Sequence, residues 1–580
     1  MKRLLLFAFV VCVNFAHATI FTSVQNGDFY TPSTWDQNSV PSSTDSILVK
    51  HLVTSSSIEI KHLEIQKPGY LSVDNITIDE HVVTDTLLQL QTLEFIKSKS
   101  DPNIYGGVLI KDWLDINNNQ VTIVDSLILE STESQTANIL EISGNGQLNG
   151  TVIVRRHILN SNRIWRYLSS PIQGSTLSDW QQEIPISGNF TNADTCCGIH
   201  AGSYPSGYSY DETYLNNKEN GWVALSGGST ENFNLNTGQG YVLFVRDNAE
   251  RKSYFDTRGT VNQGTIDIPL SYTESDSIEN DGWNLVGNPY PCKLDWDKVT
   301  ALQRRNISTA IWWNDNSSGT IVQRVYSNGV GIPASTTGII GHSQAFWIKA
   351  TKKSPTLYFE ELDKADATSP ETYYRTSQVS DILRFKLRNQ NDVVFDETVI
   401  AFDDSSSVYY DDYDAPKLDG NNIIYSLTSN GHRTAINFVP DFDTIEIQIK
   451  VDIDDAPFTL DLPTNNEYSI LDSNLSPYIE GSLITDTLIR VFVIRDMIIT
   501  SDVDREFTEA EIYPNPTNDL LHINNINEIN SIKIYNSIGK VYFEKTENFK
   551  HSIETINMKH YPSGQYFIQV DENIYHVFKS

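Results

Sequence analysis

Cysteine, methionine and long apolar runs are scarce in this chain. Its 580 residues include 4 cysteines and 3 methionines. Three cysteines, an odd number, remain after residue 18, which argues against a disulfide scaffold, and we predict no zinc site. One bridge, from Cys196 or Cys197 to Cys292, stays open. After residue 18, no stretch approaches the roughly 20 consecutive apolar residues of a membrane helix, so we predict no membrane-spanning segment.

Positive charge is also in short supply. The chain has 42 Lys and Arg against 74 Asp and Glu, a formal charge of -32. Such a field repels nucleic acid and anionic lipid, so we predict neither as a partner. The sequence lacks a Walker loop, a dinucleotide fingerprint and an H-E-x-x-H motif. What it has instead is aromatic residues, with 28 Tyr, 24 Phe and 10 Trp, a composition typical of β-sheets.

Residues 19–160 are predicted to form a short parallel β-helix-like domain. Brief apolar runs such as Ser57–Ile60 and Val121–Val124 recur there between Gly and Asn turns, with no helical period. The opening segment Asn26–Trp35 resembles the cap of such solenoids in exported Bacteroidota proteins, with Trp35 closing the stacked core.

Residues 161–362 carry an internal duplication, which predicts two tandem β modules. A segment with the same Trp-to-Pro spacing occurs twice, an Asp-Trp pair follows each copy, and a turn leading into an aromatic strand ends each copy. The matching pieces are Trp165–Pro171 with Trp283–Pro289, Asp179-Trp180 with Asp295-Trp296, and Gly238–Phe244 with Ser343–Ile348.

Clean alternation of apolar and polar residues continues toward the end of the chain. Runs such as Ile382–Leu387 and Leu488–Val493 predict a β-sandwich-like domain over residues 372–505. Three further runs separated by Pro, Asn and Gly turns predict a small C-terminal β-sandwich over 506–580. The predicted fold class is therefore all-β throughout.

The final segment resembles a known sorting signal. Four of its features match in order, namely a Tyr-Pro-Asn-Pro opening, a glycine turn, a glycine-led aromatic strand and a near-terminal lysine. The matching residues are Tyr513, Pro514, Asn515, Pro516, Gly539, Gly564, Tyr566 and Lys579. Together they are similar to the type A C-terminal sorting domain of the type IX secretion system of Bacteroidota. The resemblance implies recognition by that translocon and its sorting machinery, and assigns these residues to recognition or tail folding.

The beginning of the chain is consistent with export. Lys2 and Arg3 precede the apolar run Leu4–Phe15, as in a signal peptide. Ala16 and Ala18 form a small-x-small cleavage site, so residues 1–18 are predicted to be a removed leader.

Three groups of residues could carry chemistry. Gly341–Ala345 resembles the nucleophile elbow of serine hydrolases, but the strand-like Phe346–Ala350 follows it, so we interpret it as a turn. An acidic cluster could attract calcium, or could be a structural loop: Asp403, Asp404, Asp411, Asp412 and Asp414 around Tyr409, Tyr410 and Tyr413. Several aromatic residues in loop-rich stretches could stack on sugars: Tyr204, Tyr208, Tyr210, Tyr214, Trp222, Trp312 and Trp313.

We assign no catalytic, cofactor-binding or metal residues, with calcium the one cofactor left open. The predicted protein is secreted or held at the outer-membrane cell surface and is non-catalytic, serving adhesion, glycan contact or envelope structure. Its extracellular partner would be a glycan or a protein. The alternative is a polysaccharide hydrolase or lyase with its site on the β-helix or between the twin modules. A pair of carboxylates about 5 to 9 Å apart beside exposed rings would favour that alternative.

Overall fold

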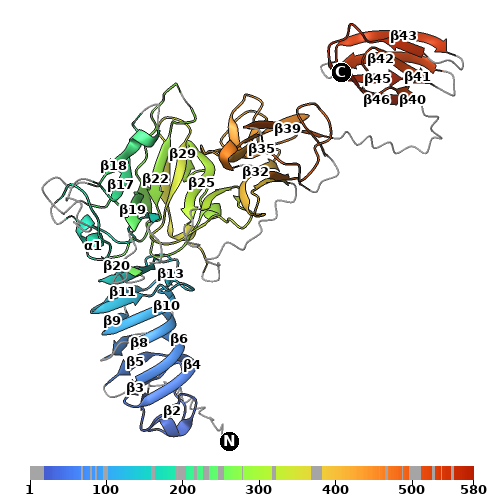
Figure 1. Ribbon diagram of the computed structural model, residues 1–580. Coiled ribbons are helices and arrows are strands. Elements are labelled where there is room, and N and C mark those ends of the chain that lie inside the picture. Colours follow the sequence, from blue (N-terminus) through green and yellow to red (C-terminus); the bar gives the residue numbers. More distant parts are fainter. Residues whose placement is uncertain are drawn as a thin grey trace, which may run out of the picture. The chain divides into compact units, whose positions relative to one another are not determined.

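The chain forms two compact units, Met1–Asp496 and Met497–Ser580, in a computed structural model, and each is described by itself (Figure 1). Both units are built from β-sheets, which confirms the all-β class. The structure describes residues 19–66, 70–78, 81–84, 88–95, 102–158, 164–190, 193, 204–214, 218–225, 234–245, 254–276, 278–315, 322–366, 382–455, 457–463, 468–485, 487–495, 511–524, 529–536, 539–549, 554–571 and 573–579.

Up to residue 158 the chain alternates between two sheets whose strands run parallel. One sheet has the order β1 (Ile20–Thr22), β3 (Ser46–Val49), β5 (His62–Ile65), β7 (Val82–Thr84), β9 (Asn103–Tyr105), β11 (Gln120–Ile123), β14 (Gln147–Asn149). The other has the order β2 (Gly27–Asp28), β4 (Leu52–Ile60), β6 (Tyr70–Ile78), β8 (Leu88–Phe95), β10 (Gly107–Asp115), β12 (Ser126–Leu129), β15 (Val152–His157), β20 (Tyr254–Gly259), with β13 (Asn138–Ile139) beside β10.

The parallel register stacks apolar side chains into columns. Ile47, Leu63, Val82, Ile104 and Ile123 are neighbours from strand to strand, and all are buried. Because alternate residues of a strand point to opposite faces, each strand adds its inward residues to one continuous core. Burial of this apolar surface is the main force that holds the stack together.

The stack is closed at both ends. Near its start, after the short 3-10 helix η1 (Pro32–Thr34), the Trp35 indole is 1% exposed and donates a hydrogen bond to the Phe29 carbonyl (2.8 Å), which agrees with the predicted capping role. At the other end β20 pairs antiparallel with β15 and ends the parallel pairing.

Two antiparallel sheets follow, and their first four strands have the same order. The β16 sheet has the order β16 (Ile164–Leu168), β19 (Tyr241–Val245), β17 (Gly207–Tyr210), β18 (Trp222–Ala224). The β22 sheet has the order β22 (Trp283–Gly287), β29 (Ala345–Ala350), β25 (Ile307–Asp315), β26 (Val322–Ser327), β27 (Val330–Ile332). In each, the first strand pairs with the last of the four, and the middle two form a hairpin.

Short elements surround these two sheets. They are α1 (Leu177–Gln181), η3 (Lys218–Gly221), β21 (Ile266–Ile268), β23 (Leu294–Asp295), η4 (Trp296–Lys298), β24 (Arg304–Arg305), β28 (Ile339–Ile340), β30 (Thr356–Phe359) and η5 (Glu361–Asp363). Trp180 of α1 packs edge-on against Tyr241, and Trp296 of η4 packs in the same way against Phe346. Each Asp-Trp pair therefore anchors a helical turn beneath its own sheet.

The two sheets join through a reciprocal seam. Leu168 forms a bridge with Gln344, while Gln239 forms one with Val286. The backbone N–H of Ser169 donates to the Ser343 carbonyl (3.1 Å), and that of Gly287 donates to the Gly238 carbonyl (2.9 Å). The end of β16 therefore contacts the start of β29, and the start of β19 contacts β22, so each sheet gives its first strand to the last strand of the other.

The last part of the first unit is one continuous sheet, here called the β35 sheet. Its order is β37 (Thr459–Asp461), β31 (Ile382–Arg388), β32 (Val394–Phe402), β35 (Arg433–Val439), β34 (Ile423–Leu427), β36 (Thr444–Lys450), β39 (Leu488–Arg495), β38 (Tyr468–Leu471), with β33 (Ala415–Pro416) beside β35 and η6 (Ile453–Asp455) after β36. One face encloses a core that includes Phe385, Ile447 and Val491. The other face packs on the β22 sheet.

The second unit has two small antiparallel sheets around one core. The first sheet is β40 (Glu511–Tyr513), β41 (Leu520–Asn524), β44 (Glu554–Asn557). The second is β43 (Val541–Phe549), β42 (Ile529–Asn536), β45 (Gly564–Val570), β46 (Asn573–Lys579).

Cysteine contributes no cross-link in the described part of the chain. Cys292 is a free, fully buried thiol, and burial raises its pKa to about 11. The bridge to Cys292 that the sequence left open is not formed, because Cys292 is free, and Cys196 and Cys197 lie outside the described residues.

Candidate functional site

One face of the β16 sheet is lined with aromatic rings, and we call it the aromatic face. Strand pairing places its residues on a common side, because directly opposed residues share a face. Trp165 pairs with Phe244, and Tyr208 pairs with Val242. The rings of the face are Trp165, Tyr167, Tyr208, Tyr210, Trp222 and Phe244.

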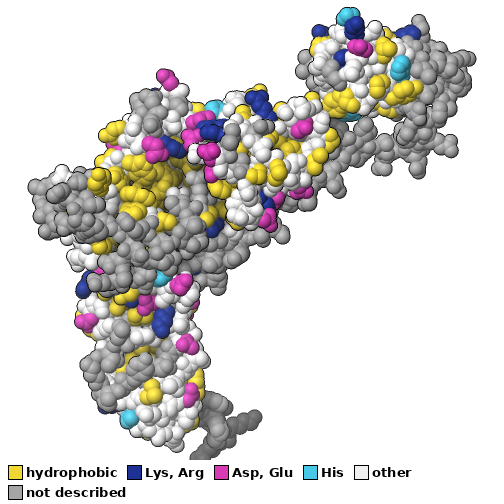
Figure 2. Space-filling view, in the orientation of Figure 1, with side chains coloured by type: hydrophobic (Ala, Val, Ile, Leu, Met, Phe, Trp, Pro, Cys, Tyr) yellow, Lys and Arg dark blue, Asp and Glu magenta, His cyan; other side chains and the backbone are white. Residues whose placement is uncertain are grey.

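The outer rings of this face are accessible. Trp165 is 37% exposed, and its ring centroid lies 5.2 Å from Phe244 and 5.7 Å from Tyr208, both half-buried. Figure 2 shows hydrophobic side chains gathered over this part of the first unit. The strand positions that form the face carry no charged side chain. Such a surface stacks on apolar faces of a ligand rather than attracting ions.

The equivalent positions of the β22 sheet are covered. Trp283 and Trp312 form a ring pair at 4.8 Å there, but they are 3% and 0% exposed. The β35 sheet lies over them with small and apolar residues: Val399, Ala401, Ala415, Ala435, Ile436 and Phe438. The two sheets thus carry aromatic pairs at matching places, one open and one buried.

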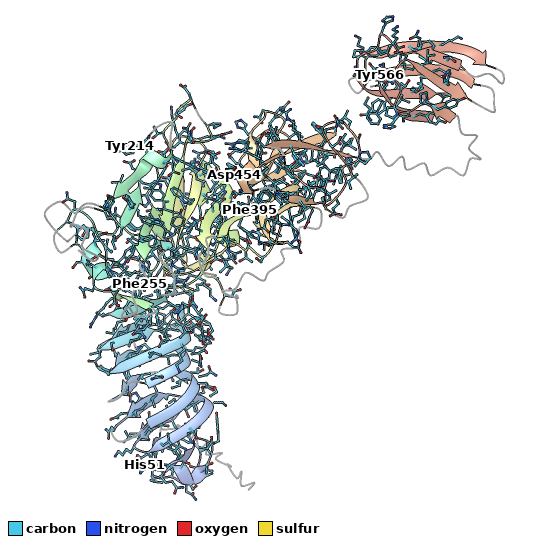
Figure 3. All side chains as sticks on the ribbon, viewed as in Figure 1. His51, Tyr214, Phe255, Phe395, Asp454 and Tyr566 are labelled. Atoms are coloured by element: carbon cyan, nitrogen blue, oxygen red, sulfur yellow. The ribbon has the colours of Figure 1, made fainter. Side chains whose placement is uncertain are left out.

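The predicted sugar-stacking residues differ in where they lie and in how exposed they are. Tyr208, Tyr210 and Trp222 belong to the aromatic face, whereas Trp312 and Trp313 are core residues. Two more are exposed outside the face, Tyr204 at 72% and Tyr214 at 52%, the latter beyond the end of β17 (Figure 3).

Sequence reasoning missed Trp165 and Phe244 as candidates. Both lie in strands where rings recur two residues apart or face a ring on the neighbouring strand. The two-residue spacing of Trp165 and Tyr167 could have placed both rings on one face of their strand, as the same spacing does for Tyr208 and Tyr210. What it could not reveal is that the Trp165 end of this face is open to solvent, whereas Tyr210 at its other end packs against the cluster under the β35 sheet.

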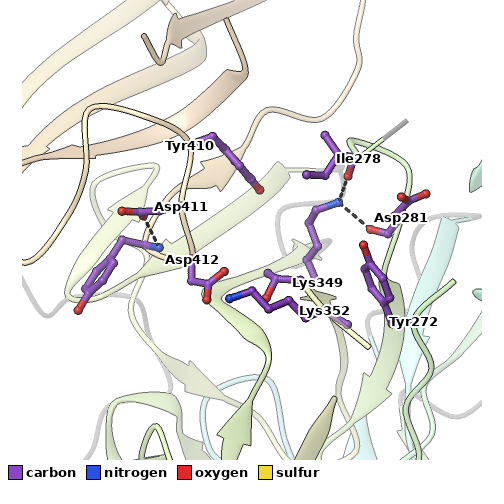
Figure 4. A pocket seen from close by; sticks show the side chains of 11 residues that line it. Tyr272, Ile278, Asp281, Lys349, Lys352, Tyr410, Asp411 and Asp412 are labelled. Atoms are coloured by element: carbon purple, nitrogen blue, oxygen red, sulfur yellow. Dashed lines mark hydrogen bonds between the residues drawn. The ribbon is translucent and has the colours of Figure 1, made fainter. Parts of the chain in front are cut away.

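A second candidate is a cavity of about 400 Å³ between the β22 sheet and the segment 403–414, which carries the acidic cluster and is here called the acidic loop (Figure 4). Lys349 lies in its wall and donates to the carbonyls of Ile278 (2.8 Å) and Asp281 (2.7 Å). Burial lowers the pKa of Lys349 to about 7. Because its ammonium group is held by main-chain oxygens, it fixes the 278–281 turn.

The carboxylates of this cavity are also held by neighbouring groups. Asp281 accepts hydrogen bonds from the backbone and hydroxyl of Ser275. Asp411 accepts from the backbone N–H groups of Ser407 and Tyr413, and burial raises its pKa. These contacts within the chain hold the loops around the cavity in place without a ligand.

The acidic cluster is a structural anchor in this chain. Asp414 is fully buried and accepts from the backbone N–H groups of Asp411 and Phe438, and burial raises its pKa to about 8. The Thr309 N–H donates to the Asp412 carbonyl (2.9 Å), which fastens the loop to β25. Across the described residues, no group of three or more His, Cys, Asp or Glu side chains could hold a metal ion.

The Gly341–Ala345 motif forms a turn that leads into strand β29, as predicted. Ser343 has a positive φ of 56° and lies 3.0 Å from His342 Nδ1, but it is only 1% exposed. Its carbonyl accepts the Ser169 hydrogen bond of the seam. The motif therefore joins the two sheets instead of presenting a nucleophile to solvent.

The Tyr-Pro-Asn-Pro motif of the second unit fastens the last strand. Asn515 Nδ2 donates to the His576 carbonyl (2.8 Å), and its Oδ1 accepts from the Phe578 N–H (2.9 Å). The side-chain amide thus pairs like a short extra strand. Tyr513 is 42% exposed, and Pro514 and Pro516 both follow cis peptide bonds.

The remaining motif residues shape turns and the core of this unit. Gly539 (φ 75°) ends the turn between β42 and β43, and Gly564 (φ 146°) opens β45. Tyr566 is 2% exposed and its hydroxyl donates to the Pro562 carbonyl (2.8 Å). Lys579 ends β46, where it forms a bridge with Thr517. Ala16 and Ala18 lie outside the described residues.

Comparison with known families identifies both parts of the chain. A model described as "Secretion system C-terminal sorting domain" matches residues 511–580, which confirms the predicted sorting tail. The protein is therefore exported to the cell surface or secreted, and its tail interacts with the type IX secretion machinery. None of the described helices is long and apolar enough to cross a membrane.

A comparison with curated proteins found no match. A second family model covers residues 106–470, which is more than half of the chain. That span includes the β16 and β22 sheets and most of the β35 sheet. The chain therefore belongs to the family described as "Domain of unknown function (DUF8693)".

Proposed function

We propose that this exported protein is a non-catalytic adhesion or envelope protein that binds an extracellular glycan on the aromatic face of the β16 sheet. One observation carries the proposal, namely that Trp165 is 37% exposed where its counterpart Trp283 is 3% exposed. Sugar rings offer apolar C–H faces, and aromatic side chains are the groups that stack on them.

Charge narrows the class of glycan. The chain has a formal charge of -32, which repels anionic polysaccharides at low salt. Because the aromatic face itself is uncharged, its contacts are stacking and water exclusion rather than ion pairing. A neutral glycan is neither repelled by the negative chain nor in need of a charged partner on the aromatic face.

The architecture supports a display role. We infer that residues 1–18 are a signal peptide, that the parallel stack is a short β-helix, and that the β16 and β22 sheets descend from one duplicated module. The shared strand order and the reciprocal seam support the duplication. The sorting tail supports an origin in Bacteroidota, the phylum whose exported proteins its motifs resemble.

A glycan array probed with the full chain tests the proposal. We expect neutral glycans to bind, and Trp165→Ala or Tyr208→Ala to weaken binding about tenfold, because a central aromatic contact is worth roughly 1.4 kcal/mol or more. Tyr409→Ala is the matched control, since Tyr409 is 58% exposed but lies in the acidic loop.

Two results would overturn this proposal. One is binding that Trp165→Ala leaves unchanged, which would move the glycan site elsewhere. The other is silence on every glycan together with capture of a purified surface protein that Trp165→Ala abolishes, which would make the aromatic face a protein-docking surface.

The second candidate function is glycan hydrolysis at the cavity beside the acidic loop. The specific observation in its favour is the raised pKa of Asp411, as expected of a general acid, in a cavity that Asp412 and Tyr272 also line. Reducing-sugar release from any glycan that binds, abolished by Asp411→Asn and retained in Trp165→Ala, would support it.

A further inference from the structure

The β35 part of the first unit contains a cavity of about 360 Å³ beside the turn that joins β34 to β35. Thr428 and Ser429 of that turn line it, together with Asn437 of β35, Phe442, Thr444 and Glu446 at or near the start of β36, and Phe492 of β39.

Asn437 is the residue that sets this cavity apart. It lies in the middle of β35, between Ile436 and Phe438, which face the β22 sheet, and so its own side chain takes the opposite face. Asn437 is fully buried, and neither its amide nitrogen nor its amide oxygen has a hydrogen-bond partner. An unsatisfied buried polar group lowers stability, and leucine would fill the place without that loss.

We infer that this cavity binds one neutral sugar residue, with the Asn437 amide as donor and acceptor to its hydroxyl groups. The inference deepens the proposed glycan contact and rests on it for the ligand class. The amide has no water-accessible surface, so a wall side chain must move aside before the sugar reaches it.

The other lining groups have the chemistry that a sugar requires. Ser429 and Thr444 supply hydroxyl groups, whereas the Thr428 hydroxyl already donates to Asn430 and accepts from the His432 N–H. The rings of Phe442 and Phe492 supply an apolar wall. Among the residues that the structure describes, no lysine, arginine or histidine lines the cavity, so an anion would find no counter-charge from them. Its one carboxylate, Glu446, already accepts from Gln448 and lies 3.5 Å from Arg490. The volume falls within the range of small-molecule sites.

Saturation-transfer NMR and calorimetry on the full chain test this inference with single monosaccharides. The probes are glucose, galactose, mannose, N-acetylglucosamine and, as the anionic comparison, glucuronic acid. We expect at least one neutral sugar to bind, glucuronic acid to fail, and Asn437→Leu to weaken binding at least tenfold. Trp165→Ala should leave monosaccharide binding intact, because the aromatic face is a separate surface.

Thr444→Val is the second variant, and it keeps the test valid if Asn437→Leu does not fold. It removes one hydroxyl group from the wall and should weaken binding severalfold. Silence from all neutral sugars, or equal binding by Asn437→Leu, overturns the inference and assigns the cavity to water. Those results leave the Trp165-dependent glycan array untouched, so failure here and failure of the proposed function are distinguishable.

Discussion

The β16 and β22 sheets carry an aromatic pair at the same two places, yet they use it differently. In the β22 sheet Trp283 and Trp312 are buried under the β35 sheet. In the β16 sheet Trp165 and Tyr208 form the matching pair, and Trp165 is 37% exposed. A ring pair on a sheet face is therefore an adaptable surface, which becomes core or binding site according to what docks on it.

The cover on the β22 sheet depends on fit and on backbone anchoring. Ala401, Ala415 and Ala435 are small enough for the two sheets to approach closely. The acidic loop adds main-chain contacts, since the Thr309 N–H donates to the Asp412 carbonyl and the Ser327 hydroxyl to the Tyr413 carbonyl. Close packing and main-chain hydrogen bonds therefore hold the β35 sheet on the β22 sheet. Without that cover, the rings of the β22 sheet would form an exposed apolar patch that promotes association.

The largest expected difference between the sheets is in stability. Trp312→Ala should lower the free energy of unfolding by about 3–5 kcal/mol, because it opens a cavity under the β35 sheet. Tyr208→Ala, at the matching position, should cost about 1 kcal/mol or less, because its ring is already half-exposed. Denaturant unfolding of the full chain, followed by tryptophan fluorescence, measures both. Equal losses would contradict the contrast between an open and a covered face.

A smaller effect is expected at the seam that joins the sheets. A Cβ on Gly287 would lie 2.2 Å from the Ser169 Cβ and 2.8 Å from the Gln239 carbonyl oxygen. Gly287→Ala should therefore cost about 1–3 kcal/mol through overpacking. Adding Ser169→Gly removes the closest contact and should recover part of the loss in thermal denaturation. No recovery would mean that the seam is not the source of the strain.

The sequence predicted the strands much better than it predicted their neighbours. Ile382–Leu387 falls within β31, and Val121–Val124 coincides with β11 up to Ile123, because alternation is a local property. The buried state of Trp312 and of Asp414 depends on the β35 sheet docking on the β22 sheet, which no local pattern encodes. Asn437 was missed for the same reason, since an asparagine in an alternating strand resembles a solvent-facing residue until its surroundings are known.

The smallest expected effect is a pH dependence that comes from Asp414 in the acidic loop of the β35 sheet. The pKa of Asp414 is raised by burial to about 8, against about 3.9 for an unfolded chain, so folding favours its protonated form. Its stabilising contribution is fully present below pH 4 and is lost as pH rises toward 8. Lys349, whose pKa is lowered to about 7, begins to change stability near pH 6, but it does so equally in the wild type and in Asp414→Asn, so comparing the two proteins from pH 5 to 7 isolates Asp414.

In that interval the wild type should lose about 1 kcal/mol of unfolding free energy per pH unit relative to Asp414→Asn, which has no proton to release. Unfolding curves of both proteins at pH 5, 6 and 7 measure the difference, and titrations common to both proteins cancel. Parallel curves would show that Asp414 is ionised in the folded chain, and the acidic loop would then hold the cover by its backbone contacts alone. The aromatic face has no buried carboxylate of this kind among its residues, so glycan binding there should not follow the same titration.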